Sequence, residues 1–184
     1  MRSQACFWVT SLLVMVLALA GAPAAAQEED PTATSSHRVF LPLIGRDVFW
    51  VHPFAAEVVT LTNQHRVAAG CAPLTINSRL MAAAQLHSKD MALHDFFGHT
   101  GSNGSSLRDR MRAQGYSFSR AAENIAAGYP TPAGVMDGWM KSPGHSANIL
   151  NCNLREIGVG YYYLANDTGN VNFHHYWTQV FGTP

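Results

Sequence analysis

The sequence predicts an α+β domain in which helices come first and an antiparallel sheet closes the chain. Between residues 54 and 150, apolar side chains recur every three or four positions, the period of helices that bury one face. Between residues 156 and 182 they alternate instead, which is typical of strands. The segment 165–170 between the two alternating runs has the composition of a hairpin turn.

Composition limits the classes of function. The chain has 184 residues, of which 47% are hydrophobic and 13% charged, with 12 basic and 12 acidic side chains. This length allows one domain with a sizeable core. A nucleic-acid partner is not expected, because binding phosphates needs a concentrated basic face and no Lys/Arg cluster is present. The low charge and the many apolar residues also exclude a largely disordered chain.

Residues 1–26 are predicted to be a secretory signal peptide. Arg2 gives a positive start, an apolar run follows at 7–20, and three alanines at 24–26 suit signal peptidase. A membrane anchor is the alternative, but the run is shorter than the roughly 20 residues that a span needs. We therefore expect a secreted, extracellular protein with no stable membrane span after cleavage. Residues 27–53 are expected to form a linker or an N-terminal extension, and the domain is expected at 54–184.

Two cysteines remain once the signal peptide and Cys6 are removed. In an exported chain, the pair Cys71 and Cys152 is more often a disulfide than two free thiols. No Cys-x-x-Cys spacing points to a zinc knuckle.

Four helical segments precede the strands. The first ends at Gly70, the second is capped by Asn77 or Ser78, a short third covers 107–114, and a fourth starts at Thr131 and is followed by a turn ending near 150. The buried stripe of the first helix is predicted to hold Val58, Leu61, His65 and Ala68, and that of the second Leu80, Ala83, Ala84, His87 and Met91.

Each alternating run predicts a strand with one face made of every second residue. The first of these faces holds Ile157, Val159, Tyr161 and Tyr163, and the second holds Phe173, His175, Trp177, Gln179 and Phe181.

Nine histidines are the main source of possible chemistry. His65 and His87 lie on helix stripes, where a partly buried imidazole is expected. His99, Glu123 and His145 instead lie in loops or at element boundaries beside small residues. They could hold zinc, because neutral imidazole and carboxylate are suitable ligands. Alternatively, they could form a buried His–Glu hydrogen-bond network, which spacing alone favours.

Seven ordered segments resemble the CAP superfamily of cysteine-rich secretory, antigen 5 and pathogenesis-related proteins, in its bacterial secreted branch. The resemblance covers about residues 55–183 and implies an α-β-α sandwich with a central antiparallel sheet. The segments are LTNQHRVAAG at 61–70, HSKDM at 87–91, FGHTGSNG at 97–104, AENIAAG at 122–128, GWMKSPGHSANIL at 138–150, EIGVGY at 156–161 and YWTQVFG at 176–182.

The resemblance implies a cleft with two histidines and two acidic residues. His99, Glu123 and His145 match three of these positions, but Ser142 stands where larger members have the second glutamate. Two imidazoles and one carboxylate can still hold one zinc ion with water as the fourth ligand. Asn124 and Ser142 are expected to line the cleft or to cap helices, and for Ser142 the cap is favoured.

Three functions remain open at this point. The favoured one is a non-enzymatic extracellular module whose cleft binds a divalent metal, a lipid or a cell-envelope ligand. The second is a metal-assisted hydrolase in which His99 and His145 hold zinc and Glu123 acts as general base or third ligand. The third uses Ser142 as a nucleophile with His145 and Glu123, although no oxyanion-hole motif accompanies them. The ligand, the biological process and the oligomeric state are not specified by the sequence.

Overall fold

The structure is a computed structural model that describes residues 51–184. The signal peptide expected at 1–26, and most of the extension expected at 27–53, lie outside the described residues. The elements in chain order are α1 (Pro53–Ala68), β1 (Thr75–Ile76), α2 (Ser78–Leu93), α3 (Leu107–Ala113), β2 (Arg120–Ala127), α4 (Pro132–Lys141), α5 (Pro143–Ile149), β3 (Glu156–Tyr163) and β4 (His175–Thr183).

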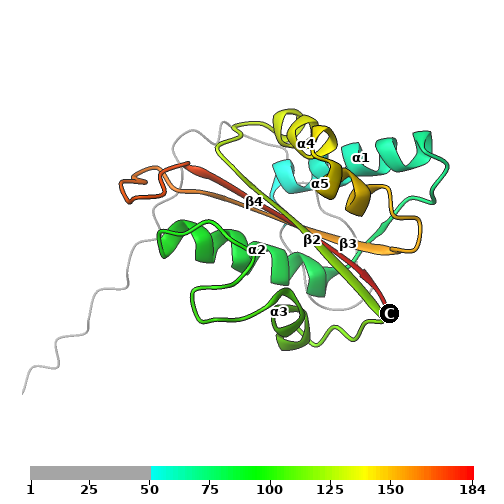
Figure 1. Cartoon of the computed structure of the whole chain (residues 1–184), viewed down its shortest axis with the longest axis horizontal. Coiled ribbons are helices and arrows are strands. Elements are labelled where there is room, and N and C mark those ends of the chain that lie inside the picture. Colours follow the sequence, from blue (N-terminus) through cyan, green and yellow to red (C-terminus); the bar gives the residue numbers. More distant parts are fainter. Residues whose placement is uncertain (1–50) are drawn as a thin grey trace, which may run out of the picture. The chain divides into compact units, whose positions relative to one another are not determined.

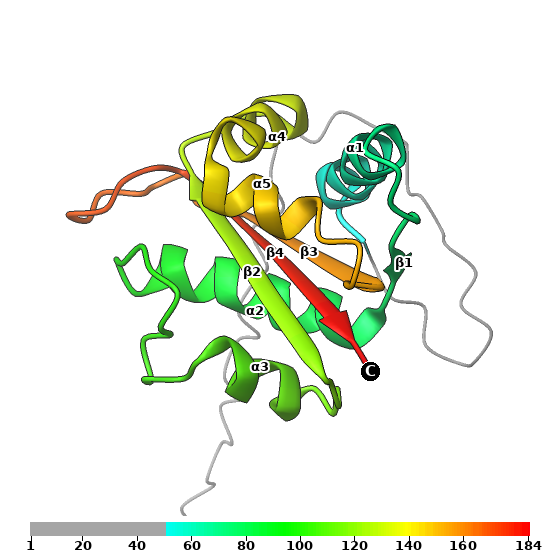
Figure 2. The same cartoon turned by 45° about the vertical axis from the view of Figure 1, so that its right-hand side comes forward.

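A four-stranded sheet lies between two layers of helices (Figure 1). Helices α1, α4 and α5 cover one face, whereas α2 and α3 cover the other (Figure 2). The predicted α+β class and its three-layer sandwich are thereby confirmed.

The strand order is β1-β3-β4-β2, and β4 pairs antiparallel with both of its neighbours. The sheet is mixed rather than purely antiparallel, because the two-residue strand β1 runs parallel to β3. Strands β3 and β4 lie in the two segments predicted from their alternating pattern, whereas β2 was not predicted. Glu123 therefore lies inside a strand. The expectation that it lies in a loop or at an element boundary was wrong.

Helix α2 packs directly on the sheet. All five residues of its predicted stripe are buried, including His87. Gly158 and Gly160 of β3 allow this close approach, because a Cβ atom at either position would overlap the backbone of Leu80 or Ala84.

The predicted stripe of α1 is only partly correct. Val58 is buried, but His65 and Ala68 are exposed. The buried face carries Thr62 and Arg66 instead, and both are fully inaccessible to solvent. The imidazole expected to be partly buried at position 65 therefore points to water, because a polar threonine and a charged arginine occupy the core positions of this helix.

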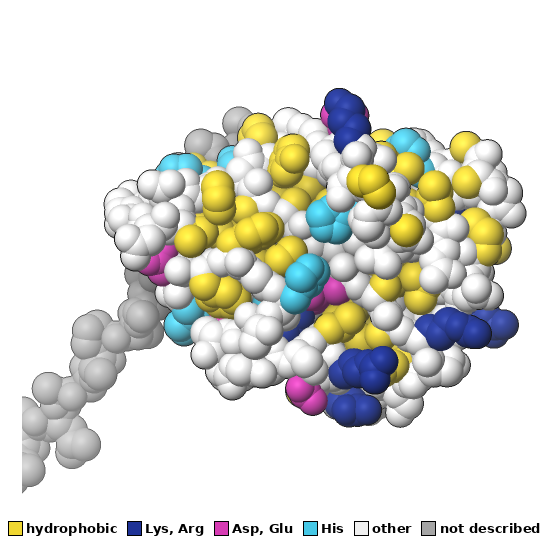
Figure 3. All heavy atoms as spheres, viewed as in Figure 1, with side chains coloured by type: hydrophobic (Ala, Val, Ile, Leu, Met, Phe, Trp, Pro, Cys, Tyr) yellow, Lys and Arg dark blue, Asp and Glu magenta, His cyan; other side chains and the backbone are white. Residues whose placement is uncertain are grey.

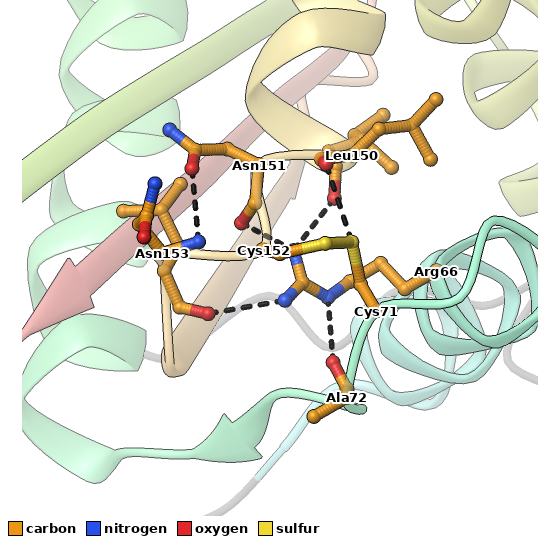
Figure 4. Close-up of a disulfide and its surroundings, with 9 residues drawn as sticks. Arg66, Cys71, Ala72, Leu150, Asn151, Cys152 and Asn153 are labelled. Atoms are coloured by element: carbon orange, nitrogen blue, oxygen red, sulfur yellow. Dashed lines mark hydrogen bonds between the residues drawn. A yellow bond between two sulfur atoms is a disulfide. The ribbon is translucent and has the colours of Figure 1, made fainter.

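Arg66 joins α1 to the chain between α5 and β3. Its Nε donates to the carbonyl oxygen of Ala72 at 3.0 Å, and its Nη2 donates to that of Leu154 at 3.0 Å. Its Nη1 donates to the carbonyl oxygens of Ile149 at 2.8 Å and Asn151 at 2.9 Å (Figure 4). The buried guanidinium thus donates hydrogen bonds to four carbonyl groups that lie at the end of a helix or in a loop. These carbonyl groups have no partner within a helix or a strand of residues 51–184.

The expected disulfide joins the same two regions. Cys71 follows α1, Cys152 precedes β3, and the bond closes a sequence separation of 81 residues with a Cα–Cα distance of 5.0 Å. It lies beside the Arg66 side chain (Figure 4). A covalent bond and a set of hydrogen bonds therefore fix the end of α5 against α1.

We predict that Arg66→Ala destabilises the domain by about 3–5 kcal/mol, because four buried carbonyl groups lose their donor together. Urea unfolding under oxidising conditions measures this loss. Arg108→Ala, at an exposed position of α3, is the matched control and should change stability by less than about 0.5 kcal/mol. Equal stabilities of the two variants would contradict the structural role of Arg66.

Candidate functional site

Glu123 is the centre of the candidate site. Its side chain is only 3% exposed, although it belongs to the outermost strand in the order, β2. Its Oε1 accepts a hydrogen bond from Nδ1 of His99 at 2.8 Å, and its Oε2 accepts one from Nη2 of Arg110 at 2.6 Å. Both carboxylate oxygens are thus engaged by side chains that lie far from Glu123 in the sequence.

Arg110 also holds the loop that carries His99. From α3, its Nη1 donates to the carbonyl oxygens of His99 at 3.0 Å and Ser105 at 2.9 Å. A capping box between Ser106 and Asp109 starts α3 at a defined point, which places Arg110 one turn into the helix. The loop, α3 and β2 are therefore joined through one guanidinium group.

The environment of Glu123 keeps its carboxylate ionised. Burial alone would raise its pKa, but the hydrogen bond from His99 and the charge of Arg110 outweigh burial, so its pKa is lowered. Because an ionised carboxylate can only accept hydrogen bonds, Nδ1 of His99 carries the proton that joins them. In the neutral ring, Nε2 of His99 is then left with a free electron pair.

Asn124 points to the opposite face of the sheet from Glu123, as adjacent strand residues do. Its Nδ2 donates to the carbonyl oxygen of His145 at 3.2 Å and to Oε1 of Gln179 at 3.0 Å, and its Oδ1 accepts from Asn148 at 2.9 Å. Gln179 donates in turn to the hydroxyl of Thr62 at 2.7 Å. This buried network joins α1, β4, β2 and α5, and it holds the turn of α5 that carries His145.

His99 and His145 come from different parts of the fold and influence each other electrostatically. His99 belongs to the chain between α2 and α3, whereas His145 belongs to α5 (Figure 2). Burial lowers the pKa of His145, and a positive charge on nearby His99 lowers it further. The imidazole of His145 is therefore neutral at pH 7, and the His99 side chain is 58% exposed.

The metal-ligand set expected from the sequence fits these positions only in part. Within residues 51–184, no group of three or more His, Cys, Asp or Glu side chains is placed to hold a metal ion. Each carboxylate oxygen of Glu123 already accepts one hydrogen bond, so direct ligation by Glu123 would have to use the second lone pair of an oxygen bonded to His99 or Arg110. Glu123 instead fixes the orientation of the His99 ring by accepting the hydrogen bond from its Nδ1.

The remaining candidates occupy supporting positions. Ser142 lies at the junction of α4 and α5 in a capping position, but its side chain makes no capping hydrogen bond. Asn124 lies inside the sheet and caps no helix. Trp139 is buried in the core, and its Nε1 donates to the carbonyl oxygen of Ile125. Sequence reasoning missed Arg110, since no local pattern distinguishes it from the other arginines of α3.

Residues 59–181 match the sequence model of the cysteine-rich secretory protein family, known as CAP. The chain belongs to the CAP family. The match covers both histidines and the glutamate of the candidate site.

Two proteins of Bacillus subtilis (strain 168) are similar in sequence to this CAP chain. The uncharacterized protein YkwD is 40% identical over 131 residues, which are 71% of this chain and 48% of that protein. The uncharacterized membrane protein YlbC is 34% identical over 113 residues, 60% of this chain and 33% of that protein. The chain thus spans about half the length of these relatives, or less.

Solved structures agree with the CAP fold. An extracellular protein containing an SCP domain from Bacillus anthracis is 28% identical with a TM-score of 0.62, covering 71% of this chain and 40% of that one. An outer surface protein from Borrelia burgdorferi is 19% identical with a TM-score of 0.61, covering 68% of this chain and 89% of that one.

We predict that Glu123→Gln lowers the stability of the domain by about 3 kcal/mol at pH 7, because the largely buried guanidinium of Arg110 loses its counter-charge. The folded-state pKa of Glu123 lies below its ordinary value of 4.5. Its contribution is therefore complete above pH 4.5 and is lost as the pH falls through the lower folded-state value.

Urea unfolding of both proteins at pH 7 and at about pH 3 measures this effect, and the difference between them should shrink in acid. Glu57→Gln, at an exposed position of α1, is the control. A difference that stays constant with pH would mean that the Glu123 carboxylate does not stabilise the fold through its charge.

Proposed function

We propose that this CAP chain is an exported, non-enzymatic binding module that holds a divalent metal ion, zinc in particular, between His99 and His145. The observation that carries the proposal is the bond from Nδ1 of His99 to the ionised Glu123. Such a bond fixes the ring and directs its other nitrogen outward as a ligand.

The charge state of the second imidazole supports the same proposal. A metal ligand must be a neutral imidazole, and the lowered pKa of His145 keeps that ring neutral near pH 7. Structural zinc sites use four protein ligands and catalytic sites use three. Two imidazoles would therefore give a weaker site, in which water or oxygen atoms of a bound partner complete the shell.

Hydrophobic groups beside His99 favour a lipid or cell-envelope molecule as that partner. Phe97 lies two residues before His99, is 44% exposed, and contacts the equally exposed Phe173 with ring centroids 6.0 Å apart. Figure 3 shows histidine side chains in the middle of one face, with hydrophobic surface beside them. An exposed apolar area next to polar groups is typical of a surface that binds a ligand.

The sequence of residues 1–26 and the disulfide both support export of this module. The sequence of residues 1–26 suits a secretory signal, and the disulfide suits an oxidising compartment. Along residues 51–184, every helix is too short or too polar to cross a bilayer. The similar protein from Bacillus anthracis is described as extracellular.

The geometry favours binding over hydrolysis. A general base needs a lone pair directed at a substrate or a water molecule, whereas the Glu123 side chain is only 3% exposed and each of its oxygens already accepts a bond from His99 or Arg110. Among the described residues, no hydrogen bond joins Ser142 to His145, so the pair expected of a serine nucleophile and its base is not formed.

Calorimetric titration of the mature protein with zinc chloride tests the proposal. We expect one ion per chain, with binding lost in both His99→Ala and His145→Ala. Glu123→Gln should weaken binding by about 10–100-fold, because His99 loses the group that orients it. His65→Ala, at an exposed position of α1, is the matched control and should bind as the wild type does. Unchanged binding in the double variant of His99 and His145 would refute the proposal.

A further inference from the structure

The chain enters the described domain beside an aromatic part of the sheet. Val51, the first described residue, is only 6% exposed and packs in the main hydrophobic core. The ring of His52, which caps α1, has its centroid 4.7 Å from that of Tyr161, and the ring of Phe54 has its centroid 5.2 Å from the same point. The residues that precede Val51 are therefore tethered close to Tyr161.

At this end the sheet is longer than the helix that covers it. Helix α1 starts beside Tyr161 and runs toward the start of β3, where Arg66 bonds the carbonyl oxygen of Leu154. Tyr163 lies two residues beyond Tyr161 on the same face of the sheet, and His175 of β4 lies opposite it. Both Figure 1 and Figure 2 show the hairpin between β3 and β4 extending beyond α1 and α4. The end of this face therefore lies past the first residue of α1.

Three residues form this part of the surface, which we call the aromatic surface: Tyr129, Tyr163 and His175. Tyr163 is 39% exposed, Tyr129 is 37% exposed, and His175 is half-buried. The rings of Tyr163 and His175 contact each other with centroids 4.9 Å apart. Tyr129 lies on the other side of His175, because Gly128 donates to the carbonyl oxygen of His175 at 2.9 Å and Trp177 donates to that of Tyr129 at 2.8 Å. Exposed aromatic rings that lie together are typical of a binding surface.

The residues that precede Val51 have the composition to cover this surface. The segment 39–50 reads VFLPLIGRDVFW, so eight of its twelve side chains are Val, Leu, Ile, Phe or Trp. Its two charged residues, Arg46 and Asp47, have opposite signs and leave no net charge. Because exposing so many apolar side chains to water is unfavourable, the segment gains free energy by packing on an apolar surface within its reach.

We propose that residues 39–50 dock on the aromatic surface of the same chain. Twelve residues reach at most about 40 Å when extended, which is enough to cross this end of the sheet. Because the segment is joined to the domain at Val51, beside the surface, its effective concentration there is in the millimolar range. A separate ligand lacks this advantage and would have to displace the segment.

Gln85 favours docking by side chains over addition of a strand to the sheet. Its Oε1 accepts a hydrogen bond from the backbone nitrogen of Tyr161 at 3.1 Å, and its Nε2 donates to the carbonyl oxygen of Tyr161 at 2.8 Å. The outer edge of β3 is thereby occupied, and a strand added at this point would have to break both bonds. Pro42 in the segment also lacks the N–H group that a strand partner supplies.

Limited proteolysis of the mature protein with trypsin tests this inference at the bond between Arg46 and Asp47. A docked segment has to detach before the protease can bind it, whereas a free peptide does not. We therefore expect cleavage at this bond to be at least about tenfold slower in the protein than in a synthetic peptide of residues 37–52.

Variants of the surface and of the segment identify where the protection comes from. The double variant Tyr129→Ser/Tyr163→Ser should raise the cleavage rate to within about twofold of the peptide, because the docking surface is lost. Trp50→Ser, which leaves the domain itself unchanged, should raise the rate relative to its matching peptide. Leu86→Ser/Leu93→Ser is the matched control, because both leucines are exposed on α2, across the sheet from α1. It should keep the protection.

Three outcomes would overturn the inference: cleavage as fast as in the peptide, protection that survives Tyr129→Ser/Tyr163→Ser, or protection that increases with protein concentration. The last result would mean that the segment covers a second copy of the chain. Zinc binding should be the same in both double variants, so this inference is tested separately from the proposed metal site.

Discussion

The ion pair between Glu123 and Arg110 is the interaction on which the rest of the candidate site depends. A carboxylate inside a sheet is costly to bury unless it is paired, and here a guanidinium and an imidazole both bond to it. The same guanidinium bonds the backbone of the His99 loop. One arginine thus connects β2, α3 and the loop that carries His99.

A second set of buried polar groups places the other histidine. Asn124 bonds α5 at the carbonyl group of His145, and Arg66 bonds the carbonyl groups at the end of the same helix. Since α5 has only seven residues, it depends on these tertiary contacts rather than on its own propensity. Two separate polar sets, built on Glu123 and Asn124 of β2, therefore hold the segments that carry His99 and His145.

The sequence predicted the elements whose burial follows a simple period. Helix α2 and strands β3 and β4 have regular apolar patterns, and each lies where it was expected. Strand β2 was missed because alanines replace the β-branched residues that mark a strand. Arg66 was missed because a charged residue is not expected in a core, and Arg110 because its partner Glu123 is distant in the sequence. The setting of His99, Glu123 and His145 beside small residues, together with the family resemblance, singled out these three residues, but only the fold shows that Glu123 bonds both His99 and Arg110.

The tautomer of His99 is the most direct test of this account. Long-range ¹H–¹⁵N correlation spectra of the histidine rings at about pH 8, above the ordinary imidazole pKa of about 6.5, report which nitrogen carries the proton. The account predicts the proton on Nδ1 of His99, with a bare Nε2, and the opposite tautomer for His87, whose Nε2 lies 3.0 Å from the carbonyl oxygen of Gly98. Glu123→Gln should change the His99 signal and leave the His87 tautomer as it is. A proton on Nε2 of His99, with Nδ1 bare, would contradict the claim that Glu123 orients this ring for a ligand.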